Sequence, residues 1–274
     1  MNEAFQKNLK LARILAAIAA VLIIVSYFVP IWWVALESVQ YPKTIFPRGI
    51  RIDFKFNGVY NGCKGQKERE ELAQTEASAD CFKEMNAINH YIGMYKIVPG
   101  RNWEERGKGE YPLYYVFETK KDAQGNDIID PETGEPVKID VTPGFLKFLD
   151  KLMIATPYLF AAFVLLVIVF IAVPNKVLAW AAMIPGLLPF YFLFFYILGL
   201  YWYGHNLSLH GGGAFRGIKP FMPTVFGEGK VAQFTTHSYP YWGFFVTLLV
   251  FVLLLLAVIY KKKALKAKEA EAAA

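Results

Sequence analysis

Four long apolar runs are the feature that most limits how this chain can fold. They cover residues 11–34, 156–173, 177–201 and 243–260. A helix rises about 1.5 Å per residue, so about 20 apolar residues cross a hydrocarbon core of about 30 Å. Hydrophobic residues also make up 55% of the 274 residues, above the roughly 45–50% that is usual in soluble domains. We therefore predict an integral membrane protein with four transmembrane helices.

Basic residues beside these runs predict the orientation in the membrane. Cytoplasmic flanks of transmembrane helices are enriched in Lys and Arg. The first run is too long for the apolar core of a signal peptide, and no A-x-A-like cleavage site follows it, so we expect an uncleaved anchor. Both termini are predicted to be cytoplasmic, because the basic residues lie before the first run, between the second and third, and after the fourth: Lys7, Lys10, Arg13, Lys176, Lys261, Lys262, Lys263, Lys266 and Lys268.

The net charge of +6 comes largely from these flanks. The exported loop mixes Lys and Arg with many Asp and Glu, so nucleic acid is not an expected partner. Membrane lipids are expected around the apolar runs. The Lys-rich tail either attracts anionic headgroups, at about 1 kcal/mol per residue near the surface, or acts only as a topology signal.

The runs divide the chain into five parts. The predicted fold class is membrane α-helical, a four-helix bundle with a small extracytoplasmic α+β domain inserted between the first two spans. We expect the two outside segments to pack together, because the shorter one is held near the membrane at both ends. The parts are 1–36 (N-terminus and first span), 37–142 (exported domain), 143–201 (interfacial helix, second and third spans), 202–240 (outside loop) and 241–274 (last span and tail).

Hydrophobic patterns predict the first half of the exported domain. Apolar and polar residues alternate over 50–57, which indicates a strand. The charged stretch 64–80 is predicted to form a surface helix. A second helix is expected after it, because apolar residues recur at helical spacing: Phe82, Met85, Ile88 and Ile92.

The second half is expected to contain strands over 114–120 and 137–141, with one or two exposed hairpins in the turn-rich text between them. Thr142 followed by Pro143 predicts the start of the next helix, because Thr caps helices and Pro suits the first turn. In the third span, Pro185, Gly186 and Pro189 predict a kink.

Cys63 and Cys81 are the two cysteines of the chain, and both lie in the exported domain. Disulfides persist outside the cytoplasm, and this wide separation does not resemble a C-x-x-C metal or redox site. We predict a structural disulfide that closes the charged loop and adds about 3 kcal/mol of stability.

His90 and Met94 are the first candidate metal ligands. They are four residues apart, so they share a face if both lie on a helix, and Met85 lies just over one turn earlier. Imidazole and thioether ligands together suit copper, particularly Cu(I). The alternative is a hydrogen-bonded His beside Met residues that fill a small core.

His205, His210 and His237 are the other candidate ligands, all in the second outside segment. The five-residue separation of the first two places them on different faces of a helix, but a loop beside glycines can bring them together. They either join His90 in one metal site at the membrane border or are separate interfacial histidines.

The spans themselves lack Asp, Glu, Lys, Arg and His in their apolar cores, which disfavours coupled transport. No nucleophile elbow, HExxH or dinucleotide-binding glycine pattern is present, so enzymatic activity is not expected.

Three stretches resemble a family of small, four-spanning bacterial membrane proteins: PIWWVALESVQYP, INHYIGM, and YGHNL followed by KPFMPTVFGEGKVAQFTTHSYP. The resemblance implies a multi-pass protein of the bacterial cytoplasmic membrane, often encoded beside copper-handling accessory genes of nitrous-oxide respiration. It points to His90, Met94, His205 and Asn206 as shared positions. This chain departs from the family in its cysteine-bracketed insert and in the extension over 95–141, both of which suit docking onto a partner.

The sequence and the resemblance together predict an accessory protein or subunit that supports an extracytoplasmic copper-dependent respiratory or oxidase system. Copper is the expected cofactor, if any, and a membrane or periplasmic protein is the expected partner. The alternative is a metal-free structural subunit that scaffolds a larger membrane complex.

Overall fold

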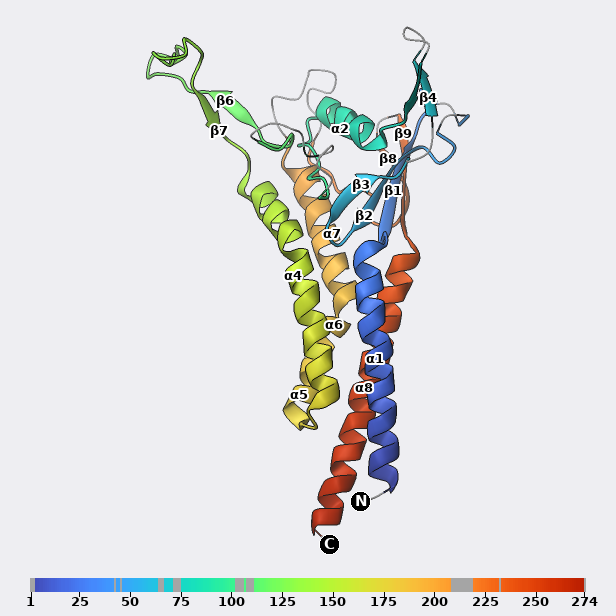
Figure 1. Cartoon of the computed structure of the whole chain (residues 1–274). Coiled ribbons are helices and arrows are strands. Elements are labelled where there is room, and N and C mark those ends of the chain that lie inside the picture. Colours follow the sequence, from blue (N-terminus) through green and yellow to red (C-terminus); the bar gives the residue numbers. More distant parts are fainter. Residues whose placement is uncertain are drawn as a thin grey trace.

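Long helices form one half of the molecule, and strands with a short helix form a cap at the other (Figure 1). The computed structural model describes residues 3–41, 43–44, 46–63, 67–70, 75–101, 106, 111–207, 219–231 and 233–273. Both termini lie at the end away from the cap. The helices are α1 (Glu3–Phe28), α2 (Cys81–Ile92), α4 (Gly144–Ala172), α5 (Lys176–Ala181), α6 (Met183–Gly186), α7 (Leu188–His205) and α8 (Trp242–Ala273).

Three helices are long and apolar enough to cross a membrane: Phe5–Phe28, Gly144–Ala172 and Trp242–Glu271. The helical pair Ala179–Gly186 and Leu188–His205 meets the same test as a unit but is bent by 41°, so the described residues hold up to four spans. The bend lies in the predicted Pro-Gly-Leu-Leu-Pro stretch, where proline removes backbone donors and breaks the regular helix. The protein is therefore a membrane helical protein with a small sheet region.

Small residues let α1 pack closely against its neighbours. Ala16 and Ala19 on α1 are fully buried, as is Ala257 on α8. In a membrane the helices gain little from the hydrophobic effect, so close van der Waals contact between small side chains stabilises the bundle. The largest shared core cluster joins α1, α4, α5, α7 and α8, and Met183 of α6 packs against it.

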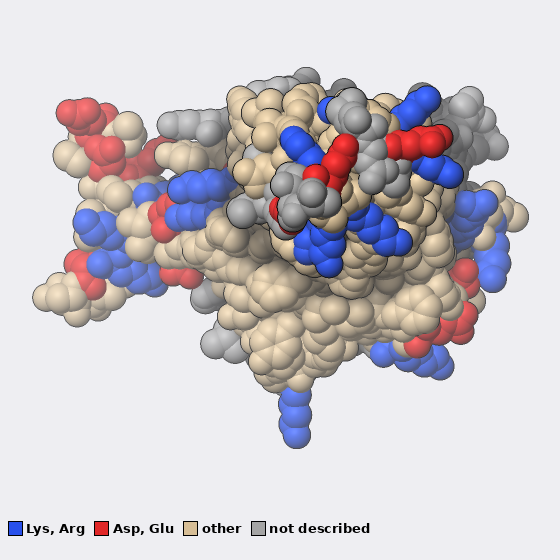
Figure 2. Space-filling model, turned by 90° about the horizontal axis from the view of Figure 1, so that it is seen from below, with Lys and Arg blue, Asp and Glu red and all other residues tan. Residues whose placement is uncertain are grey.

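Lys and Arg side chains, with some Asp and Glu among them, lie at the end of the bundle that holds both termini (Figure 2). Lys261 on α8 is 1% exposed, and its ammonium donates to the carbonyls of Phe170 and Val173, the latter at 2.7 Å. Arg13 on α1 donates to the carbonyl of Ile171 at 3.2 Å. Since α4 has no basic residue in its own last turn, the positive charge that favours this helix end comes from α1 and α8.

The first apolar run does not remain helical to its end. α1 stops at Phe28, and Trp32–Glu37 forms strand β1. Pro30 accounts for the change, because proline lacks the N–H that a helix needs and disfavours helical backbone in the residue before it. The prediction of one helix over 11–34 was therefore wrong for its last residues.

The main sheet joins the two segments that are predicted to lie outside the membrane. Its order is β3-β2-β1-β9-β8. Strand β1 pairs antiparallel with β2 on one side and β9 on the other, so Val34 lies opposite both Ile52 and Ser238. The expected packing of the two predicted outside segments is confirmed, and together they form one continuous cap. Its strands are β2 (Ile50–Lys55), β3 (Gly58–Asn61), β8 (Gly227–Val231) and β9 (Phe234–Pro240).

The cysteine-bracketed segment contains a hairpin in place of the predicted helix. Strands β4 (Lys67–Glu70) and β5 (Thr75–Ser78) pair antiparallel. The disulfide holds the Cα atoms of Cys63 and Cys81 5.7 Å apart. A single helix over 64–80 would separate its ends by roughly 25 Å. An antiparallel hairpin returns the chain to its starting point, which satisfies this constraint.

A long arm extends from the cap at the start of α4 (Figure 1). Strands β6 (Phe117–Thr119) and β7 (Lys138–Asp140) form its base, within the segments predicted to be strands. Bridges between Lys121 and Asp127 and between Ile129 and Pro136 form the expected exposed turns.

The helix after the arm begins at Gly144, and Pro143 occupies the capping position without a side-chain hydrogen bond. The predicted capping role of Thr142 was therefore wrong. Its hydroxyl accepts a hydrogen bond from the amide of Val116 at 2.9 Å, so Thr142 fastens the arm to the start of α4.

Candidate functional site

His90 and Met94 do not share a helical face. Helix α2 ends at Ile92, and Gly93 follows it in the left-handed conformation with φ of 86°. The chain turns there, and the amide of Met94 donates to the carbonyl of Asn89 at 2.8 Å. His90 is exposed, whereas Met94 lines a cavity beneath α2. The predicted helical pairing of the two residues was wrong because the glycine ends the helix first.

His205 and Asn206 stabilise the end of α7. The His205 ring stacks on Tyr201 with a centroid distance of 3.9 Å, and its Nδ1 lies 2.9 Å from the Tyr201 carbonyl oxygen. The side-chain amide of Asn206 donates to the carbonyl of Trp202 at 2.9 Å. His210 lies outside the described residues.

His237 lies on β9 between two carboxylates. Its Nε2 is 3.8 Å from Glu37 Oε2, and its Nδ1 is 3.4 Å from Glu228 Oε1. Glu37 also contacts Lys43 at 3.4 Å. Within the described part of the chain, no three His, Cys, Asp or Glu side chains are grouped to hold a metal ion. Copper binding by the candidate histidines therefore stays a prediction.

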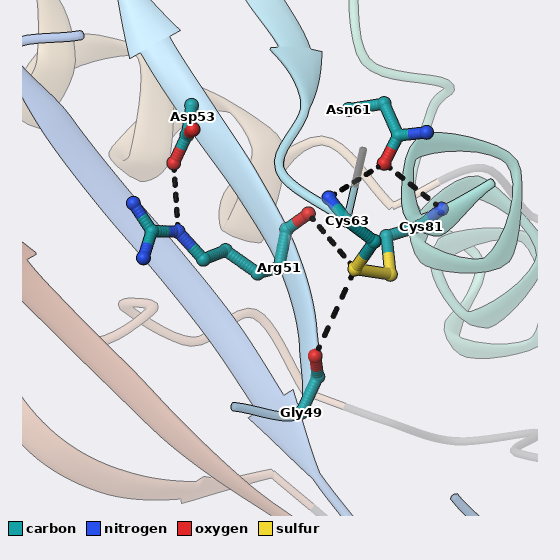
Figure 3. A network of polar contacts seen from close by, with 6 residues as sticks. All are labelled: Gly49, Arg51, Asp53, Asn61, Cys63 and Cys81. Atoms are coloured by element: carbon teal, nitrogen blue, oxygen red, sulfur yellow. Dashed lines mark hydrogen bonds and ion pairs between the residues drawn. A yellow bond between two sulfur atoms is a disulfide. The ribbon is translucent and has the colours of Figure 1, made fainter. Parts of the chain in front are cut away.

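The disulfide between Cys63 and Cys81 is confirmed. The Asn61 side-chain oxygen accepts hydrogen bonds from the amides of both cysteines, at 2.9 and 3.3 Å (Figure 3). Sγ of Cys63 lies 3.9 Å from the carbonyl oxygens of Gly49 and Arg51; a disulfide sulfur has no proton, so these are packing contacts. The bridge ties α2 to the sheet.

Arg51 links the disulfide region to the rest of the sheet. Its guanidinium donates to Asp53 at 2.8 Å and lies 5.0 and 4.9 Å from the ring centres of Trp33 and Tyr241. A buried Arg placed between two aromatic faces gains both packing and cation–π attraction. Arg51 thus ties β2 to β1 and to the start of α8.

An apolar cavity of about 410 Å³ lies beneath the cap. One face of α4 and one face of α7 line it from the membrane side, and the sheet and α2 line it from the cap side. The lining residues recur at spacings of three and four, which places them along one stripe of each helix. They are Leu149, Leu152, Met153, Thr156, Leu159, Phe160 and Phe163 on α4, and Leu188, Tyr191, Phe192, Phe195, Tyr196, Gly199, Leu200 and Tyr203 on α7.

Hydrogen bonds between the cap and α7 fix one wall of the cavity. Ser238 Oγ accepts from the indole N–H of Trp32 at 2.9 Å, lies 2.8 Å from the Tyr196 hydroxyl, and donates to the carbonyl of Val225 at 2.6 Å. The Tyr203 hydroxyl donates to the carbonyl of Lys96 at 3.1 Å. These bonds attach α7 to both of the segments that are predicted to lie outside.

This cavity and the two tyrosines that anchor its wall were not predicted from the sequence. The stripes on α4 and α7 are visible in the sequence, but such stripes usually pack against a neighbouring helix.

No family model, curated protein or solved structure matches the chain.

Asp140 and Lys147 form a salt bridge at the base of the arm, with 2.6 Å between Nζ and Oδ2. Hydrogen bonds from Lys147 and Thr142 lower the pKa of Asp140 from 3.8 to about 2. Because the folded pKa lies below the ordinary value, the carboxylate stabilises this attachment above about pH 4, and that contribution is lost as the pH falls towards 2.

A carbon-detected NMR titration of the Asp140 carboxyl group is expected to show a midpoint near 2 in the wild type. Lys147→Met should raise that midpoint towards 3.8, because it removes the hydrogen bond from Lys147, the largest cause of the lowered pKa. Lys151→Met, one turn further along α4, is the matched control and should leave it unchanged. A wild-type midpoint near 3.8 would contradict the assignment.

Proposed function

We propose that this chain is an accessory subunit of the bacterial cytoplasmic membrane, anchored by four spans with both termini in the cytoplasm. The common position of the termini and the basic residues at that end support this orientation. The cap then lies outside, where the disulfide can persist.

The observation that carries the proposal is the projecting arm. It extends away from the cap and from the helices (Figure 1), and it exposes apolar side chains that its own chain leaves uncovered. Ile129 is 50% exposed and Ile139 is 42% exposed. Exposed apolar side chains on a projecting hairpin suit contact with another protein better than a purely structural role for this chain alone. The arm is therefore the proposed docking element.

We further propose that the partner is an extracytoplasmic copper-dependent respiratory or oxidase system. The residue types at His90 and Met94, with His205, His210 and His237, support this assignment, together with the family resemblance. The separate positions of the described histidines favour the second candidate, a metal-free scaffold subunit.

Replacing Ile129 and Ile139 by Thr is expected to reduce recovery of the partner at least tenfold in a mild-detergent pulldown. Each Ile buried at an interface contributes roughly 1.5–3 kcal/mol, and 1.4 kcal/mol corresponds to a factor of ten. Thr keeps the branching that strands favour. Val39→Thr is the matched control, because Val39 is fully exposed on a cap loop. Equal recovery with both variants would contradict a docking role for the arm.

The same purified complex distinguishes the two candidates. Copper is counted after loading with Cu(I), before and after His90→Ala and Met94→Ala. A stoichiometry that falls in these variants supports the copper-linked role. A stable partner with no bound copper supports the scaffold.

A further inference from the structure

Asn89 is the polar group that sets the cavity apart from an ordinary packing defect. It lines the cavity from α2 and is 8% exposed. Its side-chain amide makes no hydrogen bond within the part of the chain that the structure describes. A buried amide without a partner is costly, so native proteins rarely leave one unless a water or ligand completes it. The amide offers both a donor and an acceptor to such a ligand.

Most other polar groups of the wall are already engaged by the protein. The Thr156 hydroxyl donates to the carbonyl of Met153 at 2.7 Å, and the hydroxyls of Thr224 and Thr236 lie 2.8 Å apart. The Lys55 ammonium lies 5.0 Å from the ring centre of Tyr60. The remaining lining is mostly aliphatic or aromatic. The wall therefore suits a ligand with one small polar group on a large apolar body.

The cavity is long enough to hold a hydrocarbon chain. Its lining on α4 runs from Leu149 to Phe163, which is about 21 Å along the helix axis. Asn89 is at the cap end, while Phe163 and Leu188 are deep in the spans. A membrane lipid has the same polarity, with its polar group at the surface and its chain in the hydrocarbon.

An apolar groove on the membrane-facing side of the bundle adjoins this cavity. Ile24, Phe28, Leu165 and Ile168 line an apolar groove between α1 and α4, and each is about half exposed or more. Phe160 belongs to the linings of both the groove and the cavity. It packs against Tyr27 and Phe56 with centroid distances of 5.1 and 5.0 Å. Phe160 is thus the residue at which the groove and the cavity adjoin.

We propose that the cavity binds a neutral long-chain amphiphile, a hydrocarbon chain that carries a carbonyl or hydroxyl oxygen. The chain lies between the facing stripes of α4 and α7, and its oxygen hydrogen-bonds to the side-chain amide of Asn89. The ligand enters from the bilayer past Phe160. An isoprenoid quinone and a long-chain glyceride or alcohol share this chemistry.

Gly199 supplies a variant that closes the cavity. It lines the cavity on α7, and a Cβ at this position meets no atom within 4 Å. Gly199→Phe should fill the space without displacing a neighbour, and Gly199→Leu replaces it if the larger variant fails to fold. Gly144→Phe is the matched control, because a Cβ there also meets no atom within 4 Å but the residue lies outside the cavity.

The test uses the whole protein in detergent and three probes: a decyl-substituted benzoquinone, dodecanol and dodecane. Binding is measured from the thermal unfolding midpoint at a fixed micelle concentration. The two oxygen-bearing probes should raise the midpoint of the wild type and of Gly144→Phe, and dodecane should bind roughly tenfold more weakly, the effect of about one hydrogen bond. Gly199→Phe should abolish all three shifts.

Asn89→Leu should remove the preference for dodecanol over dodecane while dodecane still binds. Unchanged shifts in both Gly199 variants would overturn the proposed location, and an unchanged dodecanol preference in Asn89→Leu would overturn the role of the amide. Mass spectrometry of an organic extract of the purified protein then separates a quinone from a glyceride or alcohol as the natural source.

Discussion

Replacing Cys63 and Cys81 together by Ser is expected to lower the free energy of unfolding of the cap by about 3 kcal/mol. The bridge closes a loop of 18 residues, and opening it raises the conformational entropy of the unfolded chain. Both cysteines are also buried, at 1% and 0% exposure, among Ile50, Phe82 and other core residues. The measurement is urea unfolding in detergent, followed by tryptophan fluorescence, with helical circular dichroism recorded in parallel.

Two controls separate loop opening from the burial of serine hydroxyls. The first is the Cys63→Ala and Cys81→Ala pair, which opens the loop without adding polar atoms to the core and should lose about the same stability. The second is the wild type treated with reductant, which opens the loop without any substitution. If the reduced wild type unfolds at the same urea concentration as the oxidised protein, the proposed contribution of the bridge is wrong.

Sequence patterns correctly predicted the elements that depend on residues close together in the sequence. Hydropathy located the long helices, and helical spacing located α2, whose predicted apolar residues Phe82, Met85, Ile88 and Ile92 are all buried. Alternation located β2, and the break in the third span followed from proline and glycine. The disulfide followed from compartment and spacing. Each of these features depends on residues that are close in sequence or on a single covalent pair.

The features that the sequence analysis missed depend on distant contacts. The 64–80 segment has the composition of a surface helix, but the disulfide brings its ends together and a hairpin forms. Trp32 and Trp33 continue an apolar run, but β2 and β9 pair with them in a sheet. Met94 has helical spacing from His90, yet Gly93 adopts a positive φ and turns the chain. In each case a tertiary constraint or one backbone conformation outweighed the local pattern.

The candidate site could be predicted only in its parts. The sequence shows that candidate His and Met ligands are present. Their separation in the described structure depends on the ends of α2 and α7 and on the register of β9. The stripes on α4 and α7 are also visible. That the two stripes enclose a cavity, with Asn89 above it, follows from the position of the cap, which the strand pairing between residues about 200 positions apart determines.

Ser238 lies on β9 within this pairing, and its replacement is expected to cause a large loss of stability. Its hydroxyl is fully buried and bonds to Trp32, Tyr196 and the Val225 carbonyl. Ser238→Ala leaves the indole N–H and the tyrosine hydroxyl without this partner, and each unsatisfied buried group costs about 1–3 kcal/mol. We therefore expect a loss of about 2–6 kcal/mol in the free energy of unfolding, measured by urea unfolding in detergent.

Ser26→Ala is the matched control for this prediction. Ser26 is equally buried, but its hydroxyl donates to the carbonyl of Ile23 within its own helix at 2.8 Å. Removing this hydroxyl leaves no distant group without a hydrogen-bond partner, so it should change the free energy of unfolding by less than about 1 kcal/mol. Because Ser238 joins β9, β1 and α7, its loss should also loosen the cavity wall and weaken probe binding, whereas Ser26→Ala should not. Equal stability of the two variants would mean that the hydrogen bonds of Ser238 do not help to hold the cap to α7.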